Sequence, residues 1–193
     1  MPYYKFIPKN SKLLKIKEEI SISINKANVF GIIVFAISSI IFFSHFILIW
    51  DFKLLIIGLE RFVFNLLITI PIFILSIIFH EVLHALIILF LGKINIKFIK
   101  AGFKVNLGIP YIHCTKPISS FTYKLSLLTP LITLGIIPLL YSFYSGNSWF
   151  LIYSIIFITG SSGDLFIFLK IRNIKNNVKI LDHEELPGCY ILE

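Results

Sequence analysis

His80, Glu81 and His84 form the pattern His-Glu-x-x-His near the end of a long apolar segment, residues 62–91. On a helix the two histidines lie one turn apart on the same face, so each imidazole can give a nitrogen to one tetrahedral zinc ion. Glu81 is offset around the helix, beside that face, and is available as a general base toward water that the metal activates. The spacing therefore predicts zinc-dependent hydrolysis. The competing interpretation is a pair of structural histidines hydrogen-bonded between helices, with Glu81 as a buried partner.

The composition predicts that these residues lie inside a membrane. The chain of 193 residues is 57% hydrophobic and its mean hydropathy is +0.90, values that are not typical of a soluble domain. We predict an all-α polytopic membrane protein with four transmembrane helices at residues 28–50, 62–91, 125–145 and 149–169. Ionisable side chains are expensive in hydrocarbon, so three of them in one span indicate a function.

The charges predict the topology and the domain organisation. The net charge is +8, and the basic residues lie between the apolar segments, which is typical of a membrane topology signal rather than of nucleic-acid binding. We predict a basic N-terminal segment (1–27), one membrane domain (28–169) and a polar C-terminal tail (170–193). The positive-inside rule places both termini in the cytoplasm, in a multi-pass protein of the plasma membrane.

The segment after the motif has a different periodicity. Apolar and polar residues alternate on both sides of Ala101-Gly102, which predicts a cytoplasmic β-hairpin at about residues 93–107 with its turn at that dipeptide. A proline-bounded loop is expected at residues 108–117. An exposed hairpin edge can hold an extended peptide. The residues predicted to form the substrate strand are Ile94, Ile96, Phe98, Phe103 and Val105.

A catalytic zinc site usually has three protein ligands, so the motif needs one more. The candidates are Asp164, His113, His45 and Glu60. With both motif-bearing spans running from outside to inside, His84 and Asp164 lie at similar depths, roughly 10–14 Å from the cytoplasmic boundary at helical rise. We therefore expect Asp164 to be the third ligand. The alternative is a carboxylate hydrogen-bonded to Ser161, Thr159 or water. His113 is the second candidate ligand, or an auxiliary oxyanion donor if its loop folds back.

Several of these features together resemble a known family. The motif, the hairpin, the loop Tyr111-Ile112-His113-Cys114, the Pro130 span and Ser162-Gly163-Asp164-Leu165 resemble the putative zincin peptidase membrane family, which is similar to the site-2 proteases. The resemblance extends from residue 62 to about residue 169. It implies a membrane-embedded metalloprotease with one zinc ion. Site-2 proteases place the third ligand in an Asn-Pro-x-Asp-Gly pattern, whereas Leu165 follows the aspartate here.

Three functions compete at this point. The first is a zinc protease that cleaves a membrane-anchored protein near the cytoplasmic face of the lipid bilayer, without nucleic acid as a partner. The second is a divalent-metal carrier, in which His80, Glu81, His84 and Asp164 hold metal in transit. A carrier needs polar residues on both sides of the site, and residues 71–79 offer only Ser76. The third is a catalytically silent membrane scaffold that is stabilised by its metal.

Overall fold

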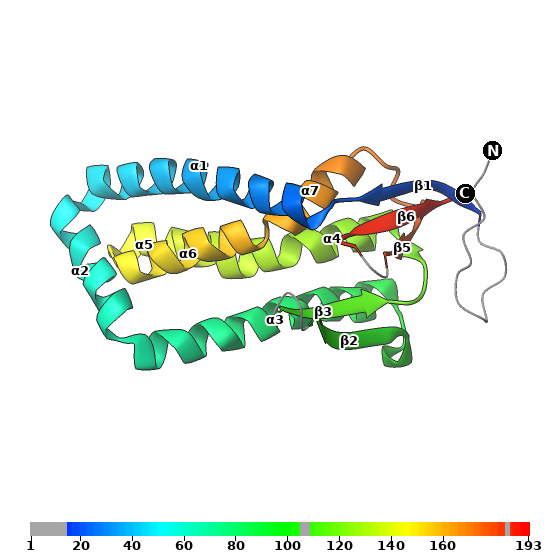
Figure 1. Cartoon of the computed structure of the whole chain (residues 1–193), viewed down its shortest axis with the longest axis horizontal. Helices are drawn as coiled ribbons and strands as arrows, with labels where there is room; N and C mark the ends of the chain where they lie inside the picture. Colours follow the sequence, from blue (N-terminus) through cyan, green and yellow to red (C-terminus); the bar gives the residue numbers. More distant parts are fainter. Residues whose placement is uncertain (1–14, 105–108, 184–185) are drawn as a thin grey trace.

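The computed structural model describes residues 15–104, 109–183 and 186–193. Within them the chain is mostly helical, and two small antiparallel sheets lie at one end of the helices (Figure 1). The helices are α1 (Ile24–Trp50), α2 (Phe52–Phe64), α3 (Leu66–Gly92), α4 (Ser120–Pro130), α5 (Ile137–Ser145), α6 (Ser148–Gly160) and α7 (Ser162–Ile171). A 3-10 turn, η1 (Ile96–Phe98), follows α3, and a π-helix, η2 (Leu131–Ile136), joins α4 to α5.

Three helical stretches are long and apolar enough to cross a membrane: α1, α3 and the continuous stretch α4-η2-α5. The pair α6 and α7, bent by 50°, makes a fourth if it is counted as one span. Large apolar side chains on α1 and α3 are exposed, Leu48 by 83% and Leu67 by 93%, as expected of surfaces that face lipid. These observations support a membrane protein.

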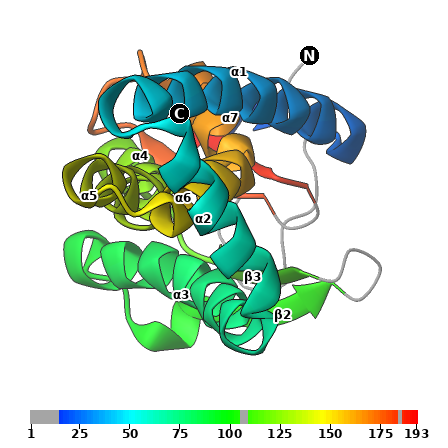
Figure 2. The ribbon, with the colours of Figure 1, turned by 90° about the vertical axis from the view of Figure 1, so that its left-hand side faces the viewer.

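The sequence predicts a short loop at residues 51–61, between the first two apolar spans, but the structure has helix α2 there. Its first turn is capped by Asp51, whose side chain accepts a hydrogen bond from the backbone N–H of Lys53. Gly58 lets α2 approach Ser148, since a Cβ at this position would clash with the serine. Helix α2 crosses the end of the molecule opposite the sheets, and Figure 2 shows it running from α1 to α3, with α5 and α6 between those two helices.

The fold is mostly helical, as predicted, but a four-stranded antiparallel sheet is present in addition to the predicted hairpin. The strands of this sheet are β1 (Ile16–Ser21), β4 (Ile118–Ser119), β5 (Lys179–Asp182) and β6 (Gly188–Leu192), in the order β1-β6-β5-β4. The pairing of β1 with β6 brings the predicted N-terminal segment and C-terminal tail together. The local periodicity of the sequence gives no indication of this long-range strand pairing.

The predicted hairpin is present but displaced along the chain. It consists of β2 (Ile99–Lys104) and β3 (Ile109–Cys114). Strand β3 lies in the segment 108–117, for which the sequence predicts a loop. Residues 105–108 connect the strands, and they lie outside the described part of the chain, as does the predicted substrate residue Val105.

Local contacts explain the displacement. The side chain of Asn95 accepts a hydrogen bond from the backbone N–H of Lys97 (3.1 Å) and starts the 3-10 turn, so Ile96 is not in a strand. Gly102 is not a turn residue. It lies in β2 opposite Tyr111, whose ring is so close that a Cβ on Gly102 would be 2.6 Å from it. A glycine covered by a cross-strand aromatic ring is a strand feature, although glycine in sequence suggests a turn.

Candidate metal centre

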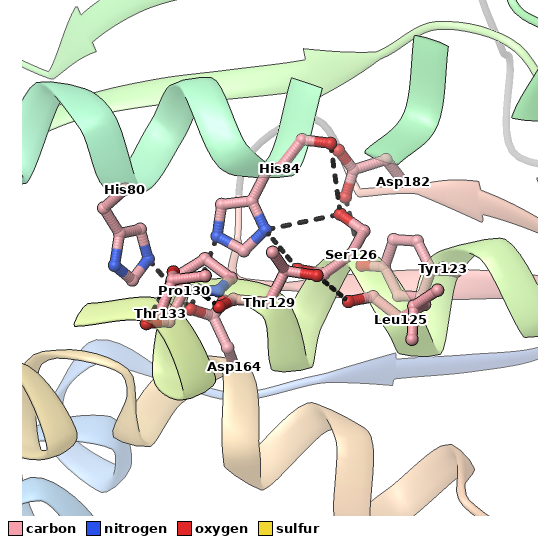
Figure 3. Close-up of polar contacts among 10 residues, drawn as sticks. All are labelled: His80, His84, Tyr123, Leu125, Ser126, Thr129, Pro130, Thr133, Asp164 and Asp182. Carbon is pink, nitrogen blue, oxygen red and sulfur yellow. Dashed lines mark hydrogen bonds and ion pairs between the residues drawn. The ribbon is translucent and has the colours of Figure 1, made fainter. Parts of the chain in front are cut away.

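Helix α3 carries both motif histidines, and they face the same direction. The ring centroids of His80 and His84 are 4.9 Å apart, and their side chains are 14% and 13% exposed. Helix α3 packs along α4, and α4 packs on α7, so the histidines point across α4 toward the start of α7. Figure 3 shows both rings on this side of α3.

Asp164 reaches the histidines because the fourth apolar segment is broken. The backbone bends between α6 and α7 at Ser161, and Asp164 lies in the first turn of the new helix. A carboxylate is favoured at this place by the partial positive charge of a helix N-terminus. Its Oδ2 atom is 3.1 Å from Nε2 of His80 and 3.5 Å from Nε2 of His84. The structure therefore brings together the three residues that the sequence analysis proposed as metal ligands.

The geometry fits a zinc ion. One ligand atom from each of His80, His84 and Asp164 can be chosen so that all three lie within 4.8 Å of one another. In a tetrahedral site with zinc–ligand bonds of about 2.0–2.1 Å, neighbouring ligand atoms are roughly 3.3 Å apart, close to the two distances given above. Two neutral imidazoles and one carboxylate are also the donor types that zinc prefers in catalytic sites.

The other candidates for the third ligand lie elsewhere. His45 is exposed on α1, and its ring contacts Phe143 of α5 with a centroid distance of 5.0 Å. Glu60 is exposed on α2. His113 is buried in β3, where its Nδ1 atom is 3.5 Å from Oδ2 of Asp182. None of these three belongs to a group of metal-ligating side chains in the part of the chain that the structure describes.

Glu81 is half-buried and lies beside the two histidines, outside the group of three converging ligand atoms. Its carboxylate lies beside the backbone of Ile112 in β3. Strand β3 packs against α3, so the hairpin is in contact with the motif helix. A carboxylate that lies close to the candidate metal ligands, but outside their group, is suited to move protons rather than to bind metal.

Two polar residues that sequence reasoning missed surround this centre. Ser126 of α4 accepts a hydrogen bond from Nδ1 of His84 on its carbonyl oxygen, at 3.0 Å. Asp182, at the end of β5, accepts hydrogen bonds from the backbone N–H of Cys114 and from the hydroxyl of Tyr123, each at 3.2 Å. Asp182 thereby ties β3 to the four-stranded sheet. Its place in a polar tail gives no signal of this role.

Comparison with known proteins gives one match. The model of the family described as putative zincin peptidase matches residues 73–179, more than half of the 193 residues, and the chain belongs to this family. No curated protein and no solved structure matches the chain. The matched range includes the motif histidines, Glu81, Ser126 and Asp164, whereas Asp182, β1 and β6 lie outside it.

Proposed function

We propose that this zincin peptidase family member is a membrane-embedded zinc metallopeptidase that cleaves a membrane-anchored protein near the cytoplasmic face. The observation that carries the proposal is the convergence of His80, His84 and Asp164 from two helices, with Glu81 beside them. Family membership indicates a metallopeptidase. The apolar helices on which the ligands lie support cleavage at membrane depth.

The residues divide the chemistry between them. His80, His84 and Asp164 hold one zinc ion, which when bound supplies Lewis-acid activation of water and of the peptide carbonyl. Glu81 accepts the proton of the attacking water and returns it to the leaving amine. To do so its carboxylate turns from the backbone of Ile112 to the reacting groups. His113 is not needed for these steps, since it faces Asp182.

A substrate helix must be extended before its scissile carbonyl is accessible, and we propose that β3 holds it. The backbone N–H of Thr115 donates to the carbonyl of Phe98, so residues that alternate with Thr115 along β3 direct their backbone groups away from β2. Ile112 and Cys114 are in this outward set, which agrees with the hydrogen bond of Cys114 to Asp182 and with the place of Glu81 beside the backbone of Ile112. The outward edge of β3 therefore runs beside Glu81.

This edge replaces the predicted substrate strand. Three of the residues predicted to form it are not in a strand, since Ile96 and Phe98 lie in the 3-10 turn and Ile94 precedes that turn. Phe103 lies in β2, on the far side of β3 from α3. An added strand would take Ile112 as its hydrogen-bond donor when Glu81 moves to the reacting groups. Cysteine crosslinking of an inactive Glu81→Gln variant to its substrate is expected at Ile112→Cys and not at Ala101→Cys of β2.

The packing of α3 against α6 disfavours the metal-carrier alternative. Between His80 and the α2 end of α3, aromatic rings fill the contact: Tyr153 lies 4.6 Å from Phe157 between centroids, and Phe73 lies 5.4 Å from Phe157. Two buried polar residues lie in this part of α3, and both are engaged. Ser76 accepts a hydrogen bond from the Tyr153 hydroxyl at 2.8 Å, and the Thr69 hydroxyl accepts one from Nε1 of Trp149 at 3.4 Å. A metal ion leaving the ligands in this direction would meet apolar rings and engaged hydroxyls.

The decisive experiment compares zinc content with cleavage in purified protein. Glu81→Gln is expected to retain zinc and to lose cleavage of membrane-anchored substrates, because the imidazoles are intact and the base is gone. His80→Ala is expected to lose both. Glu60→Gln, an exposed glutamate on α2, is the matched control and should change neither. Loss of zinc in Glu81→Gln would contradict the assignment of Glu81 as the base, and zinc binding without any cleavage by the unaltered protein would favour the silent scaffold.

A further inference from the structure

Helix α4 passes beside His84 with a gap in its backbone hydrogen bonds. In a regular helix the carbonyl of Ser126 would accept from the N–H of residue 130, but residue 130 is proline and has no N–H. The next N–H, that of Leu131, donates to the carbonyl of Leu128. The carbonyl of Ser126 therefore has no helical donor, and a buried carbonyl without a partner is costly.

Helix α3 supplies the missing donor. Nδ1 of His84 is 3.0 Å from the carbonyl oxygen of Ser126 and 3.3 Å from its hydroxyl (Figure 3). A carbonyl oxygen only accepts hydrogen bonds, so Nδ1 must carry the proton. In the neutral ring, Nε2 is then left with its lone pair, and Nε2 is the atom that faces Asp164. The gap in α4 thus selects the tautomer of His84 that can bind metal through Nε2.

Two other carbonyls of the same stretch accept hydrogen bonds from threonine hydroxyls. The Thr129 hydroxyl donates to the carbonyl of Leu125 at 2.7 Å, and the Thr133 hydroxyl donates to the carbonyl of Thr129 at 2.8 Å. These bonds lie within the α4-η2 stretch and leave the Ser126 carbonyl turned to α3. The hydroxyl of Ser126 adds a bond back to the carbonyl of His84, at 3.4 Å. Ser126 therefore contacts both the ring and the backbone of His84.

We propose that Pro130 is a positioning residue of the metal centre: by leaving the Ser126 carbonyl without a helical donor, it fixes the orientation and tautomer of His84. The inference rests on the proposed function only in that His84 is taken as a zinc ligand. Partners that orient a ligating histidine typically change metal affinity by about 10–100-fold when they are lost. Pro130 would act indirectly, through the Ser126 carbonyl that accepts the hydrogen bond from His84.

The first test reads the tautomer in metal-free protein, independently of activity. Nitrogen-15 NMR of the histidine side chains, with His84→Gln to assign the signal, is expected to show the proton of the neutral His84 ring on Nδ1. In Pro130→Ala the new N–H can bond to the Ser126 carbonyl, and the population with the proton on Nε2 is expected to rise. Zinc affinity should fall by about tenfold.

The matched control is Pro138→Ala, which changes the other proline of the same span, in the first turn of α5. It should leave both the tautomer and the zinc affinity unchanged. A neutral His84 with its proton on Nε2 in the unaltered protein would overturn the inference even if Pro130→Ala does not fold. Equal effects of the two proline changes would also overturn it. Failure of the unaltered protein to bind zinc would instead contradict the proposed function. The tautomer of His84 could still be measured, because that experiment uses metal-free protein.

Discussion

The carboxylate of Glu81 lies beside the backbone of Ile112, where the motif helix packs against the hairpin. The residue assigned as the base is therefore in contact with strand β3. The same strand is fixed on the other side by Asp182, which accepts from the backbone N–H of Cys114. A series of contacts leads from the four-stranded sheet through β3 to the reactive side of α3. These contacts link the position of Glu81 to a sheet that contains strands from the N-terminal and C-terminal parts of the protein.

The first prediction concerns the edge of β3. Ile112→Pro removes the outward N–H and leaves every proposed metal ligand in place. We expect zinc content to be unchanged and cleavage of membrane-anchored substrates to fall sharply, because both the resting place of Glu81 and the proposed donor to substrate are lost.

Phe103→Pro is the matched control, because Phe103 pairs with Pro110 and its backbone groups face away from β3. It should cleave substrate at nearly the normal rate. Normal cleavage by Ile112→Pro would show that this edge neither positions the base nor presents substrate.

The second prediction concerns the third ligand. Asp164→Asn replaces a carboxylate with a neutral amide, which is a poor zinc ligand, and zinc affinity should fall by more than about 100-fold, beyond the loss typical of a residue that only orients a ligand. The measurement is competition with a chelator of known affinity. Asp182→Asn, a carboxylate outside the centre, should bind zinc within a few-fold of the unaltered protein. Retention of zinc by Asp164→Asn would move the third-ligand assignment to another residue.

The motif and its partner were predictable because each has a local signal. The spacing of His80 and His84 fixes a shared helix face, and Asp164 is conspicuous as a charge in an apolar segment. In the structure, ligand atoms of all three residues lie within 4.8 Å of one another. Ser126 could have been found in the same way, since it lies one helical turn before Pro130, and a proline always leaves the carbonyl of that residue without its donor.

The strands were harder to predict because their registers are set by distant contacts. The alternation around Gly102 favours a turn when it is read locally, whereas the ring of Tyr111, brought by the facing strand, makes Gly102 a strand residue. The pairing of β1 with β6 depends on residues from opposite ends of the chain. Helix α2 was missed because its three charged residues resemble those of a loop, although Leu55 and Gly58 are buried against the bundle.

The third prediction concerns orientation in the membrane. The two native cysteines, Cys114 and Cys189, are buried and are poor reporters, so we choose exposed positions. In intact cells, Lys53→Cys at the start of α2 should react with a membrane-impermeant maleimide, and Lys175→Cys, between α7 and β5, should react only after permeabilisation. The positive-inside rule predicts this orientation, with Lys53 outside the cell and Lys175 in the cytoplasm. The opposite pattern would place the sheets outside and contradict cleavage near the cytoplasmic face.

The last prediction concerns the thiol of Cys189 in β6, beside the carboxylate that holds β3. Burial, and secondarily the charge of Asp182, raise the pKa of the Cys189 thiol to about 12. In the unfolded chain a cysteine titrates near about 8.5. The folded state therefore binds this proton more tightly, so its contribution to stability is complete below about pH 8.5 and is lost as the pH rises from there toward 12.

Alkylation measures this shift directly. In the folded protein, the rate of reaction of Cys189 with iodoacetamide should keep rising with pH beyond 10, whereas in sodium dodecyl sulfate it should level off above about pH 9, because only the thiolate reacts. Cys114→Ser removes the other thiol and isolates the signal. Asp182→Asn should lower the pKa of Cys189, since it removes the neighbouring negative charge while the burial of the thiol persists. A folded-state rate that levels off near pH 9 would show that Cys189 is solvated, and that the sheet does not pack around Asp182 as described.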